Sequence, residues 1–180
     1  MINKWVVLGL FAVLAACSTM NSALHREKTA IALLAPTEGY IASGVVNFSQ
    51  DGDLMQIEVR VDGLKPNSLH GLHIHSTGDC RAPDASSAGG HFNPHGSSHG
   101  GPHSEPRHIG DLGNILADES GSAIISIEVN GISLGKGVDS IIGRAVIVHA
   151  QADDLSSQPS GNAGPRIACG LISKNPDTFF

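Results

Sequence analysis

The sequence has no cluster of lysine or arginine residues, and its formal net charge at pH 7 is -6. Nucleic acids and anionic membrane surfaces select clustered positive side chains, so neither is expected as a partner. No stretch shows the sustained periodicity of an amphipathic helix, which argues against a helical fold. The length of 180 residues with 41% hydrophobic content is that of one globular domain.

The chain also lacks an apolar run long enough to cross a membrane as a helix. The apolar run from Trp5 to Ala16 follows Lys4, and its dozen or so residues are too few for a hydrocarbon layer of roughly 30 Å. This pattern is typical of a secretory signal. It ends in Leu14-Ala15-Ala16-Cys17, which resembles a bacterial lipobox, where Cys17 is lipidated and becomes the first mature residue. Cleavage without lipidation is the alternative.

We therefore expect a signal peptide over residues 1–16, a flexible tether over residues 17–28 and the functional domain over residues 29–180. Membrane contact is expected only through the lipid on Cys17.

Cysteine is scarce, with three residues in the chain and no C-x-x-C pair. Without Cys17, the even pair Cys80 and Cys169 in an exported protein favours a disulfide. Such a bond would close a loop of about ninety residues and restrict the unfolded chain by about 4 to 5 kcal/mol in the entropy model. Two thiolate metal ligands are the weaker alternative, because neither cysteine belongs to a C-x-x-C pair and histidines already supply ligands.

Alternation of apolar and polar residues is the main pattern of the mature chain, and it predicts an antiparallel all-β sandwich or barrel. Two long connections, Ser76 to His108 and Ala150 to Arg166, interrupt it, and connections of that length are usually functional. The strands are expected at Thr29–Leu34, Ile41–Phe48, Met55–Val61, Leu69–His75, Ile109–Leu116, Ala123–Val129, Ile141–His149 and Ile167–Ser173.

Histidines supply the candidate functional residues. His73 and His75 are two apart in an expected strand, so both imidazoles project from one face while Leu72 and Ile74 project from the other. Such a pair can bind one metal ion. The further ligand candidates lie in a segment rich in Gly, Pro and Ser and at the end of a strand-like run, and they are His91, His99, His108, Asp111 and His149.

Imidazole suits both Zn²⁺ and Cu²⁺, and Zn²⁺ also accepts a carboxylate. The absence of usable thiolates and of a methionine-rich motif argues against a blue-copper or Cu(I)-storage site. Three histidines with one aspartate would make a tetrahedral zinc site, and the remaining imidazoles a four-nitrogen site of the kind Cu²⁺ prefers. Two such sites need more imidazoles than the chain offers here, unless one histidine bridges both ions through its two ring nitrogens.

Several motifs in one order resemble copper/zinc superoxide dismutase, from about Thr29 to Ser173. The Leu14-Ala15-Ala16-Cys17 start and the short spacing from His75 to Cys80 resemble bacterial exported, lipoprotein-type members of that family. The resemblance implies an eight-stranded Greek-key, immunoglobulin-like barrel or sandwich. The motifs are Gly71-Leu72-His73-Ile74-His75, Gly90-His91-Phe92-Asn93-Pro94, His99-Gly100-Gly101-Pro102, Arg107-His108-Ile109-Gly110-Asp111-Leu112-Gly113-Asn114, Val148-His149 with Ala152-Asp153-Asp154-Leu155, and Gly161-Asn162-Ala163-Gly164-Pro165-Arg166-Ile167-Ala168-Cys169-Gly170.

The resemblance also implies residue roles. One Cu²⁺ per subunit would bind His73, His75, His91 and His149, and one Zn²⁺ would bind His91, His99, His108 and Asp111. His91 would be shared and catalytic, and Arg166 would be the guanidinium beside the open copper face. Asp153 would join His73 to His99, and Cys80 would pair with Cys169. Arg144 and Asp154 would be structural, and His95 and His103 have no counterpart among the ligands.

The implied reaction converts two superoxide anions and two protons to O₂ and H₂O₂, by cycling Cu(II)/Cu(I) next to a structural zinc. The implied setting is the periplasm, with a lipid anchor in the bacterial outer membrane, protection of the envelope, and a homodimer as an allowed assembly. The connection before Arg166 is shorter than in the familiar eukaryotic members and lacks lysine, which suggests weaker steering of the substrate. The alternative function is a non-catalytic periplasmic copper/zinc buffer or copper-delivery protein.

Overall fold

The computed structural model describes residues 28–174. The expected signal peptide, the lipidation site Cys17 and nearly all of the tether lie outside the described residues. Within the described range the chain forms eight strands and one short 3₁₀ helix. The strands are β1 (Lys28–Pro36), β2 (Ser43–Asp51), β3 (Leu54–Asp62), β4 (Leu69–His75), β5 (Asp111–Leu116), β6 (Ala123–Val129), β7 (Ala145–His149) and β8 (Arg166–Lys174), and the helix is η1 (Ser86–Ala88).

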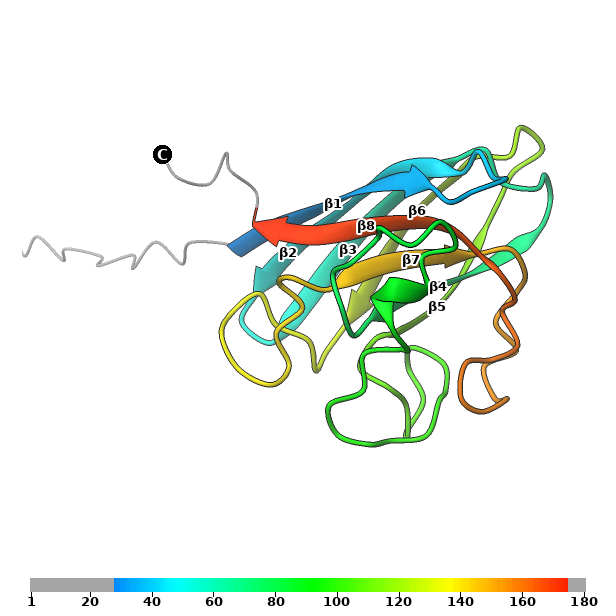
Figure 1. Cartoon of the computed structure of the whole chain (residues 1–180). Helices are drawn as coiled ribbons and strands as arrows, with labels where there is room; N and C mark the ends of the chain where they lie inside the picture. The colour runs from blue at the N-terminus through cyan, green and yellow to red at the C-terminus, as the bar shows by residue number, and fades with distance from the viewer. Residues whose placement is uncertain (1–27, 175–180) are drawn as a thin grey trace, which may run out of the picture.

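The strands form one antiparallel sheet in the order β5-β4-β7-β8-β1-β2-β3-β6. The two outermost strands, β5 and β6, lie next to each other, so the sheet curls into a nearly closed barrel (Figure 1). The chain crosses between the two halves of the barrel after β3, β5 and β6, which is a Greek-key arrangement. The prediction of an eight-stranded antiparallel all-β fold is confirmed.

Three predicted strand starts are wrong by a few residues. Strand β2 begins at Ser43 because Ile41 is 78% exposed and follows a turn closed by the Tyr40 amide on the Thr37 carbonyl, 3.1 Å away. Strand β7 begins at Ala145 because the Arg144 amide bonds back to the Ile141 carbonyl at 3.1 Å. Strand β5 begins at Asp111, two residues later than expected. Ile41 and Ile141 are apolar but lie in or next to turns, and their hydrophobicity led to the early predicted starts of β2 and β7.

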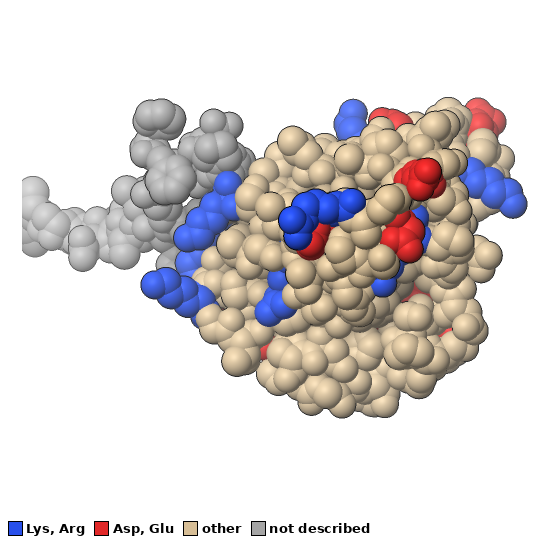
Figure 2. Space-filling view, viewed as in Figure 1, with Lys and Arg blue, Asp and Glu red and all other residues tan. Residues whose placement is uncertain are grey.

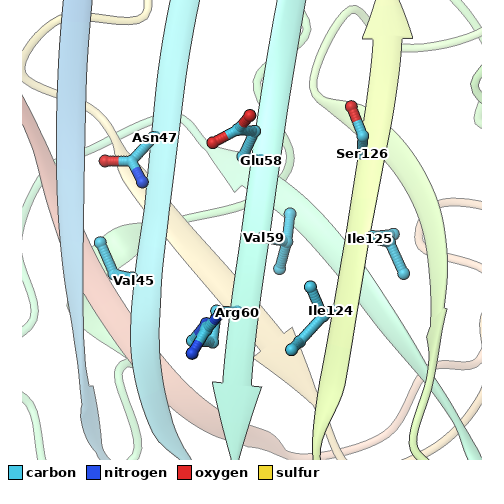
Figure 3. A pocket seen from close by; sticks show the side chains of 8 residues that line it. All are labelled: Val45, Asn47, Glu58, Val59, Arg60, Ile124, Ile125 and Ser126. Atoms are coloured by element: carbon cyan, nitrogen blue, oxygen red, sulfur yellow. The ribbon is translucent and has the colours of Figure 1, made fainter.

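Alternation along the strands sorts the side chains between the barrel interior and solvent. In β3, Met55, Ile57, Val59 and Val61 are buried while their neighbours are exposed. The outward side chains of β2, β3 and β6 line a shallow groove in which Glu58 of β3 lies between Asn47 and Ser126 of the neighbouring strands (Figure 3).

Strands β4 and β7 differ because they are buried on both faces. One face packs on the barrel core, and the two long connections cover the other. Both connections extend from the barrel on the same side, drawn in green and orange in Figure 1. A hydrogen-bonded pair joins them, the His99 amide and the Gln158 side-chain oxygen 2.7 Å away.

A disulfide between Cys80 and Cys169 ties the first long connection to β8, as predicted. Cys169 is buried in a small apolar cluster with Ala85, Ala88, Ala145 and Ile147, whereas Cys80 is exposed. None of the described residues forms a helix that is long and apolar enough to cross a bilayer.

We predict that Cys80→Ser lowers the free energy of unfolding by about 4 to 5 kcal/mol, because the bond closes a loop with a sequence separation of 89 residues. Cys169 then remains as a buried thiol, which packs like a small apolar side chain. Urea unfolding of both proteins measures the difference. Reductant should bring the wild-type protein to the stability of the variant, and equal stabilities without reductant would refute the prediction.

Candidate metal centre

The barrel brings four of the predicted histidine ligands together at the outer face of β4 and β7. Leu72 and Ile74 point into the core, so His73 and His75 point outward. His149 ends β7, where Val148 pairs with Leu72 of β4. A single β-bridge to His75 carries His91 alongside.

The candidate ligand atoms form two groups, and within each group they lie within 4.8 Å of one another. His91 belongs to both groups, so its ring stands between two potential metal positions. The first group contains His73, His75, His91 and His149, and the second contains His91, His99, His108 and Asp111.

Each imidazole of the first group other than His91 uses one ring nitrogen on the protein scaffold. His75 Nδ1 donates to the Gly89 carbonyl at 2.8 Å, His149 Nδ1 donates to the Gly164 carbonyl at 3.0 Å, and His73 Nε2 donates to the carboxylate of Asp153 at 2.8 Å. These bonds fix the tautomers and leave the other nitrogen of each ring as a bare lone pair.

The remaining nitrogens are buried and have no hydrogen-bond partner, at His73 Nδ1, His75 Nε2, His91 Nε2 and His149 Nε2. Leaving a buried polar atom unpaired costs about 1 to 3 kcal/mol. Four such atoms converging on one place fit a metal ion that takes four nitrogen ligands, as Cu²⁺ does.

The second group has the spacing of a tetrahedral site. Asp111 carboxylate oxygens lie 2.8 Å from His91 Nδ1, 3.1 Å from His99 Nδ1 and 3.2 Å from His108 Nδ1. Ligand atoms about 2.0 to 2.1 Å from a tetrahedral Zn²⁺ are about 3.3 Å apart. His99 Nε2 donates to Asp153 at 2.9 Å, so His99 Nδ1 faces the Asp111 carboxylate as a lone pair. A cation between the two atoms removes this repulsion.

Asp153 links the two groups. One carboxylate oxygen accepts from His73 and the other from His99, and Asp153 is 3% exposed. The side chain of Asn114 pairs with the backbone of Asp153 in both directions, at 2.7 and 2.8 Å. Asn114 thus fixes the backbone of Asp153, and the Asp153 carboxylate orients one ring of each group.

Sequence reasoning missed Asn114 and Gly161 as parts of this support. Gly161 has φ +62°, and a Cβ there would collide with the Asp153 carboxylate and lie 2.7 Å from His99 Nε2. Asn114 closes the motif that begins at Arg107, which was the only signal for it in the sequence. The role of Gly161 depends on its close approach to Asp153 and to His99, the latter distant in the sequence, so no local pattern predicts it.

Burial keeps the imidazoles of His73, His75 and His149 neutral at pH 7. It lowers the pKa of His73 to about 4 and that of His149 to about 3, and it lowers the pKa of His75 well below its ordinary value. Burial also raises the pKa of Asp111, but hydrogen bonds from His91 and from the Gly100 amide outweigh this and hold it at about 2. The free nitrogens of His73, His75 and His149 therefore carry no proton that a metal must displace, whereas His91 Nδ1 donates to Asp111 and would lose its proton to a metal.

Arg166 lies at the start of β8, and its guanidinium donates to the carbonyls of Ala85 at 2.5 Å and Gly89 at 2.6 Å. The Gly89 carbonyl also accepts from His75 Nδ1. Gly89 itself has φ +74°, and a Cβ there would lie 2.5 Å from the Ser76 hydroxyl. Both bonds of Arg166 go to neutral acceptors, so its positive charge stays available to an anion.

Several further titratable residues lie outside both groups. His95 bonds to Asp139 at 2.7 Å with both side chains partly exposed, and His103 is exposed. Arg144 stacks on Phe92, 3.5 Å from the ring centroid. The Asp154 carboxylate accepts the Ser156 and Ser157 amides and the Asn162 side chain. His70 is buried and donates from Nδ1 to the His149 carbonyl at 2.8 Å.

Known proteins resemble the chain over nearly its whole length. Residues 42–172 match the family described as copper/zinc superoxide dismutase (SODC). "Superoxide dismutase [Cu-Zn]" of Paramecium bursaria Chlorella virus 1 is 41% identical over 180 aligned positions, covering 97% of this chain and 95% of that protein. "Extracellular superoxide dismutase [Cu-Zn]" of Brugia pahangi is 42% identical over 164 positions, covering 86% of this chain and 80% of that protein.

We predict that Asp153→Asn weakens metal binding by about 10- to 100-fold, because the new amide group offers a donor where His73 or His99 also donates. Competition with a chelator of known affinity measures the change. Asp118→Asn is the control, because that exposed carboxylate accepts hydrogen bonds only from Ser120 and Ser122 of its own turn and should leave metal affinity unchanged. Equal affinities for the two variants would contradict the linking role of Asp153.

Proposed function

The chain belongs to the copper/zinc superoxide dismutase family, and from this membership we propose how its own residues carry out the reaction. The enzyme converts two superoxide anions and two protons to O₂ and H₂O₂, with copper and zinc as cofactors. The observation that carries the proposal is His91, whose two nitrogens belong to two different groups of buried ligand atoms.

We assign the four-nitrogen group to copper and the group with one carboxylate to zinc, following the ligand preferences of the two ions. When bound, copper supplies a one-electron redox couple that oxidises one superoxide and reduces the next, and zinc supplies a fixed charge without redox chemistry. The rest of the mechanism is positioning by the protein.

His91 is the proposed proton carrier. Its Nδ1 lies 2.8 Å from Asp111 in the zinc group, which holds the ring in place. Its Nε2 faces the copper group and has no other partner, so this atom can take up a proton and release it without a movement of the ring. The released proton becomes one of the two protons of H₂O₂.

Arg166 is the proposed substrate-binding residue. Superoxide is a small anion, and the guanidinium is anchored by two backbone carbonyls beside His75. Its charge raises the local concentration of anions and orients them toward the four-nitrogen group. The part of the long connections that extends below the barrel shows few acidic or basic side chains in Figure 2, and we propose that Arg166 acts on the anion at close range.

We further propose that the protein is exported and held at the bacterial outer membrane by a lipid on Cys17. The signal-like start of the sequence supports this, as does the extracellular designation of the Brugia pahangi relative. Globomycin, which blocks removal of lipoprotein signals, should cause the precursor to accumulate. Normal processing in its presence would rule out the anchor. A homodimer also stays a prediction, to be measured by sedimentation.

A metal buffer or copper-delivery protein is not favoured. Such a protein would need neither Arg166 nor a histidine shared between two groups, and this chain has both.

The direct test is a dismutation assay on the purified full-length protein with its copper and zinc content quantified. We expect high activity, and we expect His149→Ala to abolish it, since that variant loses one of four nitrogens from the copper group. A wild type that is fully metallated but inactive would support the buffer function instead.

Arg166→Gln separates binding of the anion from electron transfer in the same assay. The copper content should stay unchanged because Arg166 is not in either ligand group. The activity should fall, and so should the affinity for azide, a small anion that competes with superoxide. Unchanged azide affinity would remove Arg166 from the substrate site.

A further inference from the structure

The second long connection contacts His99 twice, at the ring and at the backbone. Asp153 accepts from the ring, as described above. Gln158 pairs with the backbone, because the His99 amide donates to Gln158 Oε1 at 2.7 Å and Gln158 Nε2 donates to the His99 carbonyl at 3.0 Å. One carboxamide thus satisfies both polar groups of one peptide residue, as a neighbouring strand would.

The carboxamide is itself held in position. Gln158 Nε2 also donates to the Ser156 carbonyl at 3.1 Å. The turn that carries it is closed by the Gly161 amide on the Ser157 carbonyl at 2.7 Å, and Asp154 accepts the Ser157 amide at 2.7 Å. These hydrogen bonds hold both the side chain of Gln158 and the turn that carries it.

His99 needs such support because its segment belongs to no strand or helix. Its ring aims Nδ1 at Asp111, and that direction depends on the backbone at residue 99 as well as on the side-chain torsions. The next residue, Gly100, is fixed separately by its amide on Asp111 at 3.1 Å. Without Gln158, the amide and carbonyl of His99 would lose the partners that the structure gives them.

We propose that Gln158 is a positioning residue for the zinc group, acting by clamping the backbone of His99. This inference rests on the proposed assignment of His99 to zinc. The second long connection would then hold one ligand at two points, because Asp153 holds the ring of His99 and Gln158 holds its backbone. The two long connections are thereby coupled through the zinc group.

The test compares Gln158→Met with Gln151→Met in the purified full-length protein. Methionine keeps the length of the side chain and removes its hydrogen bonds. Gln151 lies in the same connection and is exposed, and the described structure shows hydrogen bonds to it only through its backbone. We expect Zn²⁺ to transfer to a chelator about 10-fold faster from Gln158→Met and at the wild-type rate from Gln151→Met.

A second measurement reports geometry at the zinc group. Co²⁺ alone is bound in place of zinc, and its visible spectrum responds to the arrangement of its ligands. Gln158→Met should change this spectrum, and Gln151→Met, which keeps both hydrogen bonds of Gln158 to His99, should not. Thermal unfolding of the metal-free variants verifies that both are folded, as the exposed position of residue 158 leads us to expect.

Wild-type rates and an unaltered cobalt spectrum in Gln158→Met would overturn the proposal. Equal acceleration in both methionine variants would also overturn it, because the effect would then belong to the connection as a whole. Zinc retention by His99→Ala would instead remove His99 from the zinc group, which is a failure of the proposed function and is distinguishable from a failure of the clamp.

Discussion

The centre depends on how each imidazole of the first group divides its two nitrogens between the protein and the ligand site. One nitrogen bonds to the scaffold or, for His91, contacts Asp111 of the second group. The other nitrogen is buried with a free lone pair. A protein interior tolerates such atoms only where something else satisfies them. The fold therefore assembles a set of donors whose natural partner is a cation, and every feature around them serves to keep the lone pairs convergent.

The supports come from different parts of the chain and form a continuous chain of contacts. Asn114 of β5 holds Asp153, which holds His73 of β4 and His99 of the first long connection. Gly89 holds His75 from one side and Arg166 of β8 from the other. A change at Asp153 would be felt at both groups of ligands, whereas a change at Gly89 would be felt at the first group and at Arg166.

Much of the fold could be predicted from alternation, because burial on one face imposes a period of two in strands such as β3. The starts of β2 and β7 could not, since Ile41 and Ile141 are apolar but lie in or next to turns defined by backbone hydrogen bonds. The candidate ligands could be named from their spacing and from the family motifs, and their roles stay predictions. Asn114, Gln158 and Gly161 act through contacts between distant segments, and such contacts leave no periodic trace in a sequence.

The carbonyl of Gly89 is a common reference point for two partners with different tasks. It fixes how far the guanidinium that attracts an anion stands from a ring that offers its lone pair to a metal. The segment between Cys80 and Gly89 also supplies the Ala85 carbonyl to Arg166 and packs Ala85 and Ala88 against Cys169. An insertion or deletion in this segment that moved the Gly89 oxygen would therefore disturb His75 and Arg166 at the same time.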